Sequence, residues 1–231
     1  MIVAANFKMN KTKKEVQEYV KVLDVVDFDG IKVRVFPPCT ALMNKDYIGV
    51  QNAYPAENGA YTGEIGYEQL KEFEIDKILI GHSERRHILK ESQKFIVEKF
   101  NFYKNKGFEI YYCIGEPLDI RKKGIKEVSE YLKAQLVGID LDYEKLIIAY
   151  EPVWAIGTGV SASLEEIKQT HKEIRKLTDK PILYGGSVKP ENIKKIISLP
   201  NVDGALIGSA SLKVENFIKM IEIAKEVKEK K

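Results

Sequence analysis

Three short segments carry side chains that could act together on a small carbonyl compound. Asn6 and Lys8 stand two residues apart after an apolar run, so an extended chain presents their amide and ammonium groups on one side. His82 and Glu151 each follow another apolar run, and His82 precedes a short helical stretch whose N-terminus would disfavour an imidazolium. A carboxylate base, a neutral imidazole and a cation suit proton abstraction beside a carbonyl group.

The segment after Glu151 has the composition of an apolar lid. It begins with a proline, contains the only tryptophan of the chain and includes two glycines, which suits a flap that excludes water from a site. A buried acid alone would not explain this composition. The predicted lid consists of Pro152, Val153, Trp154, Ala155, Ile156, Gly157, Thr158 and Gly159.

Two later apolar runs end in small residues that could surround an anion. One is followed by Gly185, Gly186 and Ser187, and the other by Gly208 and Ser209. Small residues let backbone N–H groups converge on a phosphate. Together with the base, the imidazole and the lysine, they predict a small phosphorylated substrate.

The elements that must place these residues follow from hydrophobic patterning. Nearly continuous apolar runs are typical of parallel strands covered on both faces, and amphipathic stretches at 13–26, 92–106 and 164–177 predict helices. About 29 residues per strand and helix unit, with no glycine in the first turn, favour a (β/α)8 barrel over an open doubly wound sheet. The eight predicted strands are 2–5, 31–36, 47–50, 78–80, 110–114, 146–150, 182–184 and 202–207.

Composition bounds the partners and the compartment. Lys and Arg number 37 against 34 Asp and Glu, a net charge of +3, which gives no field for nucleic acid or a membrane surface. Two cysteines, Cys39 and Cys113, are too few for a disulfide framework or a zinc site. The sequence shows no leader-like N-terminus and no membrane-length apolar run. We therefore expect a cytoplasmic, single-domain protein with neither nucleic acid nor a membrane as partner.

Several residues have an alternative, structural interpretation. Glu84 fits equally well a first-turn acid stabilised by the helix dipole and a catalytic partner. Asn6 and Lys8, each taken alone, are typical of a turn residue and a surface lysine. Structural roles in ion pairs or helix packing are the better interpretation for Arg85, Arg86, His87 and His171.

Taken in order, these motifs are similar to those of the triosephosphate isomerase family. The resemblance implies a single-domain (β/α)8 TIM barrel with eight parallel strands. It also implies interconversion of dihydroxyacetone phosphate and D-glyceraldehyde 3-phosphate through an enediol(ate), in glycolysis and gluconeogenesis, with neither a metal nor an organic cofactor. The matching segments are NFKMN (6–10), GAYTGE (59–64), IGHSERR (80–86), CIGE (113–116), YEPVWAIGTG (150–159), YGGS (184–187) and GSASL (208–212).

The resemblance also implies residue roles. Glu151 would move the proton between carbons, and His82 would be the neutral electrophile. Lys8 with Asn6 would orient the substrate and stabilise negative charge, and Glu84 would support Lys8 and the proton relay. Tyr184 would bond the closed lid. The phosphate would be bound, mainly through N–H groups, by Gly157, Ser187, Gly208 and Ser209.

A long polar connection at 52–66 implies a partner subunit. Loops of this length inside a compact domain are usually functional or interfacial. Tyr61 and Thr62 resemble the family segment that inserts into the neighbouring subunit beside the catalytic lysine, so the resemblance implies a homodimer.

The sequence departs from the family pattern at Ser209, among other places, and it leaves two rival functions open. Ser209 stands where family members usually have a second glycine. A rival of another class is a protein that binds phosphorylated metabolites without catalysis. A Schiff-base aldolase on the same barrel would need an activated lysine deep in the site, whereas the sixth predicted strand offers Glu151 and Lys8 stands beside a polar partner.

Overall fold

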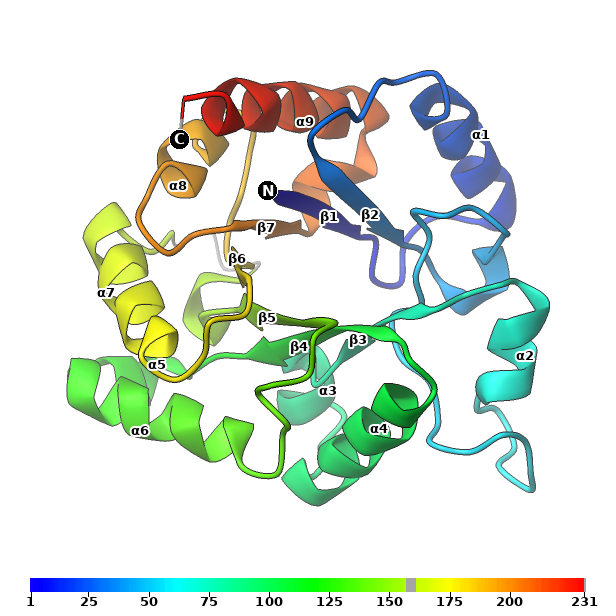
Figure 1. Cartoon of the computed structure of the whole chain (residues 1–231), viewed down its shortest axis with the longest axis horizontal. Helices are drawn as coiled ribbons and strands as arrows, with labels where there is room; N and C mark the ends of the chain where they lie inside the picture. Colours follow the sequence, from blue (N-terminus) through cyan, green and yellow to red (C-terminus); the bar gives the residue numbers. More distant parts are fainter. Residues whose placement is uncertain (157–160, 231) are drawn as a thin grey trace.

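The computed structural model describes residues 1–156 and 161–230. Its centre is a parallel sheet curved into a nearly closed barrel, and helices surround it (Figure 1). Within the described residues the sheet has seven strands in the order β2-β1-β7-β6-β5-β4-β3. They are β1 (Ile2–Asn6), β2 (Lys32–Phe36), β3 (Lys77–Ile80), β4 (Glu109–Ile114), β5 (Leu146–Tyr150), β6 (Ile182–Tyr184) and β7 (Gly204–Ile207).

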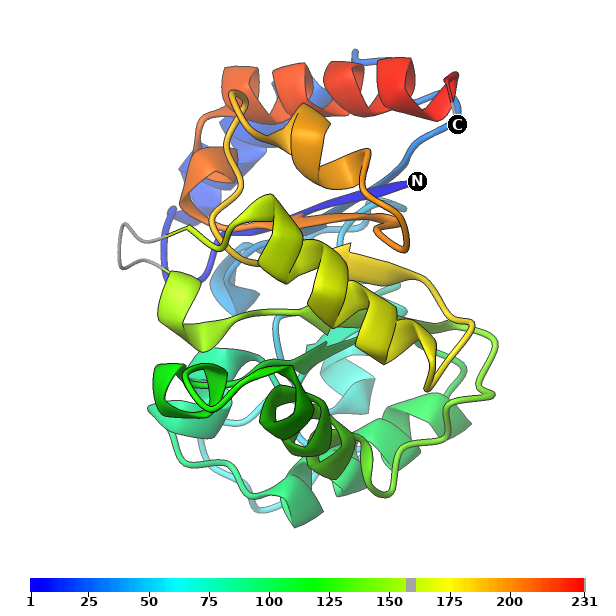
Figure 2. The ribbon, with the colours of Figure 1, turned by 90° about the vertical axis from the view of Figure 1, so that its left-hand side faces the viewer.

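The helices lie on the outer side of the sheet, as the side view also shows (Figure 2). The three predicted from amphipathic patterning are α1, α4 and α7, and each ends one to three residues short of the predicted stretch. Thr12 and Ser163 form capping boxes with Glu15 and Glu166, which satisfy N–H groups at the starts of α1 and α7. The helices are α1 (Lys13–Leu23), α2 (Tyr67–Glu72), α3 (Ser83–His87), α4 (Gln93–Asn105), α5 (Leu118–Arg121), α6 (Ile125–Leu136), α7 (Leu164–Arg175), α8 (Ile193–Ile197) and α9 (Val214–Lys228), with 3-10 turns η1 (Cys39–Ala41), η2 (Val153–Ala155) and η3 (Ser209–Leu212).

The predicted strand at 47–50 is not a regular strand in the structure. It forms single parallel bridges, Val35 with Ile48 and Val50 with Ile78, and so lies between β2 and β3. Backbone hydrogen bonds still join it to both neighbours, from Gly49 N–H to the Val35 carbonyl and from Val50 N–H to the Lys77 carbonyl. Gly49 meets the ring of Phe36, which lies 2.4 Å from where a Cβ would be. The other seven predicted strands are confirmed, with shifts of one or two residues at some ends.

Strand residues alternate between two apolar clusters. The larger cluster lies between the sheet and the helices. A smaller one lies inside the barrel and includes Ile2 and Ala4 of β1, Phe36 of β2, and Tyr111 and Cys113 of β4. Burial on both faces explains why the strands read as continuous apolar runs.

A cluster of charged side chains on β2 and β4 lies near the segment at 47–50, which forms only isolated bridges. Lys32 and Arg34 of β2 each contact the Glu109 carboxylate of β4 at 2.8 Å. The Tyr111 hydroxyl donates to the same carboxylate at 2.7 Å. Burial opposes ionisation of Glu109, but these hydrogen bonds outweigh it and lower its pKa from 4.5 to about 2. The cluster therefore ties β2 to β4 across the part of the barrel that lacks a full ladder.

We expect Glu109→Gln to lower the free energy of unfolding at pH 7 by about 2 to 3 kcal/mol, because the folded state loses the pair that depresses this pKa. The contribution is complete above the unfolded pKa of 4.5 and is lost as the pH falls toward about 2. Urea unfolding of wild type and variant, at one fixed protein concentration and between pH 7 and pH 3, measures both free energies of unfolding. The difference between these two free energies should become smaller at acid pH. Glu144→Gln, at an exposed carboxylate, is the control. A difference that does not change with pH would contradict this role for Glu109.

Candidate active site

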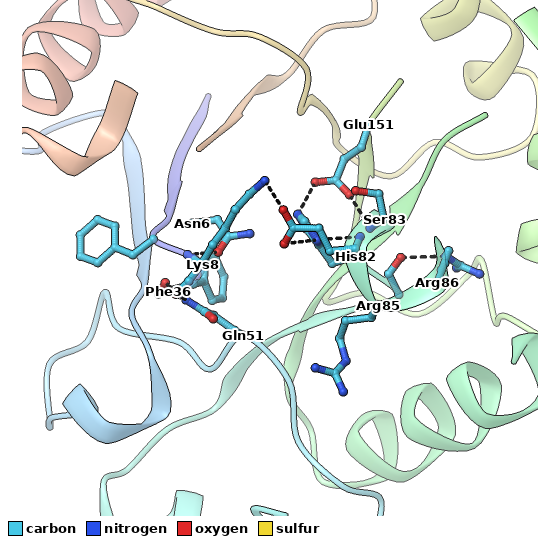
Figure 3. Close-up of polar contacts among 12 residues, drawn as sticks. Asn6, Lys8, Phe36, Gln51, His82, Ser83, Arg85, Arg86 and Glu151 are labelled. Carbon is cyan, nitrogen blue, oxygen red and sulfur yellow. Dashed lines mark hydrogen bonds and ion pairs between the residues drawn. The ribbon is translucent and has the colours of Figure 1, made fainter. Parts of the chain in front are cut away.

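The carboxyl ends of three strands bring the predicted catalytic residues together. Asn6 ends β1, His82 follows β3 by two residues, and Glu151 directly follows β5. All three line one cavity of about 310 Å³ together with Lys8. Figure 3 shows the side chains of Lys8, His82 and Glu151 converging from different strands.

Lys8 has a strained backbone that its neighbours hold in place. Its φ of 51° lies in the left-handed region, which non-glycine residues rarely adopt. The Asn6 side-chain oxygen accepts the Lys8 N–H at 2.9 Å, and Gln51 donates to the Lys8 carbonyl at 2.9 Å and to that of Phe36 at 2.8 Å. Such strain is typical of functional positions. Sequence reasoning missed Gln51, although it directly follows the predicted strand at 47–50.

The Lys8 ammonium reaches across the cavity to Glu84. The two charged groups are 2.6 Å apart and partly exposed to solvent. Glu84 lies in the first turn of α3, and its backbone N–H donates to His82 Nδ1 at 3.3 Å. Glu84 is therefore a first-turn acid of α3, as one interpretation of the sequence expected, and it also pairs with Lys8.

His82 is buried, with 5% of its surface exposed, and its ring is fixed from both sides. Because Nδ1 accepts the Glu84 N–H, the neutral ring carries its proton on Nε2, which lies 3.0 Å from a Glu151 carboxylate oxygen. Burial disfavours the imidazolium, but the Glu151 carboxylate outweighs it and raises the pKa of His82. The protonation of this ring thus depends on where Glu151 lies.

Glu151 is a buried carboxylate with 2% of its surface exposed. It contacts His82 and also accepts the backbone N–H of Ser83 at 3.2 Å. Burial alone would raise its pKa, but His82, the Ser83 N–H and Lys8 outweigh burial and lower it. The group is therefore ionised near neutral pH, as a general base must be.

The opposite wall of the cavity carries hydrogen-bond donors that bond to none of the described residues. The loops after β6 and β7 line it with Gly186, Ser187, Gly208 and Ser209. Among the described residues, nothing accepts the backbone N–H groups of Gly186, Ser187 and Gly208. Unsatisfied N–H groups that face one cavity provide a site for an anionic group. Gly157, the fourth predicted phosphate residue, lies outside the described residues.

Ser209 needs no glycine-like backbone. It is the first residue of η3, and it is not among the described residues with positive φ. The substitution of a serine for the usual glycine therefore leaves the turn unstrained. Its side chain is exposed at the wall of the cavity.

The first part of the predicted lid is anchored to a buried carboxylate. Pro152 precedes η2, and the Trp154 indole N–H donates to Glu116 at 2.9 Å. The same oxygen of Glu116 contacts Arg121 at 2.7 Å. Ile156 lines the cavity, whereas Gly157, Thr158 and Gly159 lie outside the described residues. Sequence reasoning gave Glu116 and Arg121 no role, although the segment CIGE drew attention to the former.

Other predicted residues lie away from the cavity walls. Tyr61 is 47% exposed and stacks on Tyr54 with ring centroids 4.1 Å apart, and Thr62 is exposed beside it. His171 is buried behind β5 and β6, where its Nδ1 lies 2.9 Å from the Asn201 carbonyl and burial lowers its pKa to about 4. None of these three residues lines the cavity.

Across residues 1–156 and 161–230, no three His, Cys, Asp or Glu side chains are grouped so that they could hold a metal ion. The same residues contain no helix long and apolar enough to cross a membrane.

Comparison with known proteins agrees with this geometry. The family model described as triosephosphate isomerase matches residues 1–224. A triosephosphate isomerase from Nitratiruptor sp. is 58% identical over 99% of this chain and 100% of its own length. Those of Sulfurimonas denitrificans and a Sulfurovum species are 52% and 55% identical, over 100% and 96% of this chain and 98% and 99% of their own lengths. The chain belongs to the triosephosphate isomerase family.

Proposed function

We propose that this protein interconverts dihydroxyacetone phosphate and D-glyceraldehyde 3-phosphate, a step of glycolysis and gluconeogenesis. The observation that carries the proposal is the Glu151 carboxylate beside the His82 imidazole and near Lys8, in one cavity. The opposite wall of this cavity has N–H groups for which the described residues offer no acceptor. A base, an electrophile and a cation around one small cavity are what an aldose–ketose isomerisation through an enediol(ate) requires.

The reaction is a proton transfer between adjacent carbons. Glu151 removes the proton from the carbon next to the carbonyl, and that electron pair forms the carbon–carbon double bond while the carbonyl oxygen takes up negative charge. His82 Nε2–H donates to this oxygen, and the Lys8 ammonium, held by Asn6 and Glu84, stabilises the charge. His82 passes a proton to the former carbonyl oxygen and takes one from the hydroxyl on the deprotonated carbon. Glu151 then returns its proton to the former carbonyl carbon, so that the carbonyl and the hydroxyl have changed places.

Substrate binding would change the protonation of His82. In the structure Glu151 rests on His82 and Ser83, and this contact raises the pKa of the imidazole. When Glu151 turns to the substrate carbon, burial, the Lys8 charge and the Glu84 N–H on Nδ1 favour the neutral ring. The Glu84 carboxylate, 3.5 Å from Nδ1, acts against them, but burial has the larger effect. Departure of the base would therefore make His82 the neutral electrophile.

The phosphate group would lie against the wall formed by Ser187, Gly208 and Ser209. Their backbone N–H groups, with that of Gly157 from the lid, would donate to its oxygens. Binding of a distant phosphate holds the reacting carbons in place beside Glu151 and so supports catalysis as well as affinity. No metal or organic cofactor takes part in this proposal.

The protein is proposed to act as a single-domain, cytoplasmic homodimer. In support, Tyr61 and Thr62 of the connection at 52–66 are exposed, and Met9, next to Lys8, is 96% exposed. Insertion of this connection beside Lys8 of a partner would cover Met9. Equilibrium sedimentation that returned only a monomer would contradict the dimer.

A direct test of the reaction is a coupled assay of glyceraldehyde 3-phosphate conversion. We expect Glu151→Gln to lower kcat by at least about a thousandfold, because an amide cannot accept the proton. Circular dichroism and thermal unfolding of the variant show whether the fold is retained. Glu144→Gln, at an exposed carboxylate outside the cavity, is the matched control.

Two results would contradict the proposal. Wild-type protein that binds phosphate esters without turnover would favour the binding-only function. A Glu151→Gln variant with wild-type turnover would remove Glu151 from the role of base. Borohydride trapping with substrate should leave no adduct, since the mechanism forms no Schiff base.

Closure of the proposed lid should be visible in the fluorescence of Trp154, the only tryptophan. The proposed movement takes its indole away from the buried Glu116 carboxylate, so we expect saturable changes in emission as inorganic phosphate or substrate is added. Sodium chloride at matched ionic strength is the control. Binding detected by calorimetry with unchanged emission would contradict the lid.

A further inference from the structure

Two serines of the cavity wall carry hydroxyls that bond to none of the described residues. Ser187 follows β6 and Ser209 follows β7, and these two strands are neighbours in the sheet. Both residues line the cavity, and neither hydroxyl has a hydrogen-bond partner in residues 1–156 and 161–230. The wall therefore offers side-chain donors in addition to its backbone N–H groups.

The turn that carries Ser209 is fixed from behind. The Ser211 hydroxyl lies 2.7 Å from the Gly208 carbonyl and 3.0 Å from the Ile207 carbonyl. The Tyr19 hydroxyl in turn donates to the Ser211 carbonyl at 2.8 Å. Ser209 itself has an unstrained, right-handed backbone as the first residue of η3. Its hydroxyl is thus presented on a rigid support, which reduces the entropy cost of a hydrogen bond to a ligand.

Little uncompensated positive charge lies near this wall, although the proposed ligand is a phosphate dianion. The Lys8 ammonium lies 2.6 Å from Glu84, so part of its charge is already compensated. Lys189 also lines the cavity but is exposed to water. Neutral donors must then supply much of the stabilisation, and each one added has a measurable effect on affinity.

We propose that the Ser209 hydroxyl donates a hydrogen bond to the substrate phosphate, and that this makes Ser209 a determinant of affinity for phosphorylated trioses. The inference rests on the proposed function, which places the phosphate at this wall. A glycine at this position supplies only its backbone N–H. The hydroxyl is far from the reacting carbons, so it acts on bound substrate and transition state alike and lowers KM more than it changes kcat.

The test compares Ser209→Gly, Ser209→Ala and Ser209→Thr with the wild type. We expect the glycine and alanine variants to raise KM and the inhibition constant of inorganic phosphate by about three- to tenfold, with water replacing part of the lost bond. The threonine variant keeps the hydroxyl and should retain the wild-type inhibition constant. Ser198→Ala, at an exposed serine outside the cavity, is the control.

A comparison of two substrates distinguishes loss of a phosphate contact from a general disturbance of the active site. D-Glyceraldehyde lacks the phosphate, so loss of the hydroxyl should lower the ratio of kcat/KM for glyceraldehyde 3-phosphate to that for D-glyceraldehyde. A distorted site would lower both values together and leave the ratio as it was, which would overturn the inference. Unchanged or lower phosphate inhibition constants in the glycine and alanine variants would also overturn it.

The measurements also distinguish an error in the proposed isomerase function from an error in the inference about Ser209. If the wild type shows no isomerase activity, calorimetry with inorganic phosphate still measures the effect of each substitution. Weaker binding in Ser209→Gly and Ser209→Ala would then support the hydroxyl as a phosphate ligand while the isomerase proposal fails. Equal binding in all the variants would overturn the inference itself.

Discussion

The contact between Glu151 and His82 is the interaction on which the rest of the site depends. A carboxylate that is almost fully buried is stable only with compensating partners, and Glu151 has the imidazole at 3.0 Å and the Ser83 N–H at 3.2 Å. The same contact lowers the pKa of the base and raises that of the imidazole. Each group therefore controls the protonation of the other, and movement of the carboxylate toward a substrate would change both.

The barrel makes this contact possible because parallel strands deliver their last residues to one edge. His82 and Glu151 come from β3 and β5, separated by β4, and Asn6 comes from β1 on the other side of the ring. Hydrogen bonds from nearby residues then fix the orientation of Lys8 and His82. The left-handed backbone of Lys8 is held by Asn6 and Gln51, and the first turn of α3 fixes the His82 ring through the Glu84 N–H.

Much of this arrangement could be predicted from sequence because the signals are local. Continuous apolar runs indicated seven of the strands, Thr12 and Ser163 marked helix starts, and the residues after the strands indicated the site. The eighth strand, predicted at 47–50, is not confirmed, because this segment forms isolated bridges to β2 and β3 and no regular strand. The contacts of Gln51, Glu116 and Glu109 join residues distant in the chain, so their positions in the sequence did not reveal their partners. Ser209 was visible in the sequence, but its unstrained turn required the structure.

The most direct measurement is a nitrogen-15 NMR titration of the His82 ring in the wild type and in Glu151→Gln. Removing the carboxylate takes away the group that raises the pKa of His82, so we expect a lower pKa in the variant. The neutral ring of each protein should show Nδ1 without a proton and Nε2 with one, because the Glu84 N–H occupies Nδ1. An unchanged or higher pKa in the variant, or a proton on Nδ1 of the neutral ring, would contradict the dependence of His82 on Glu151.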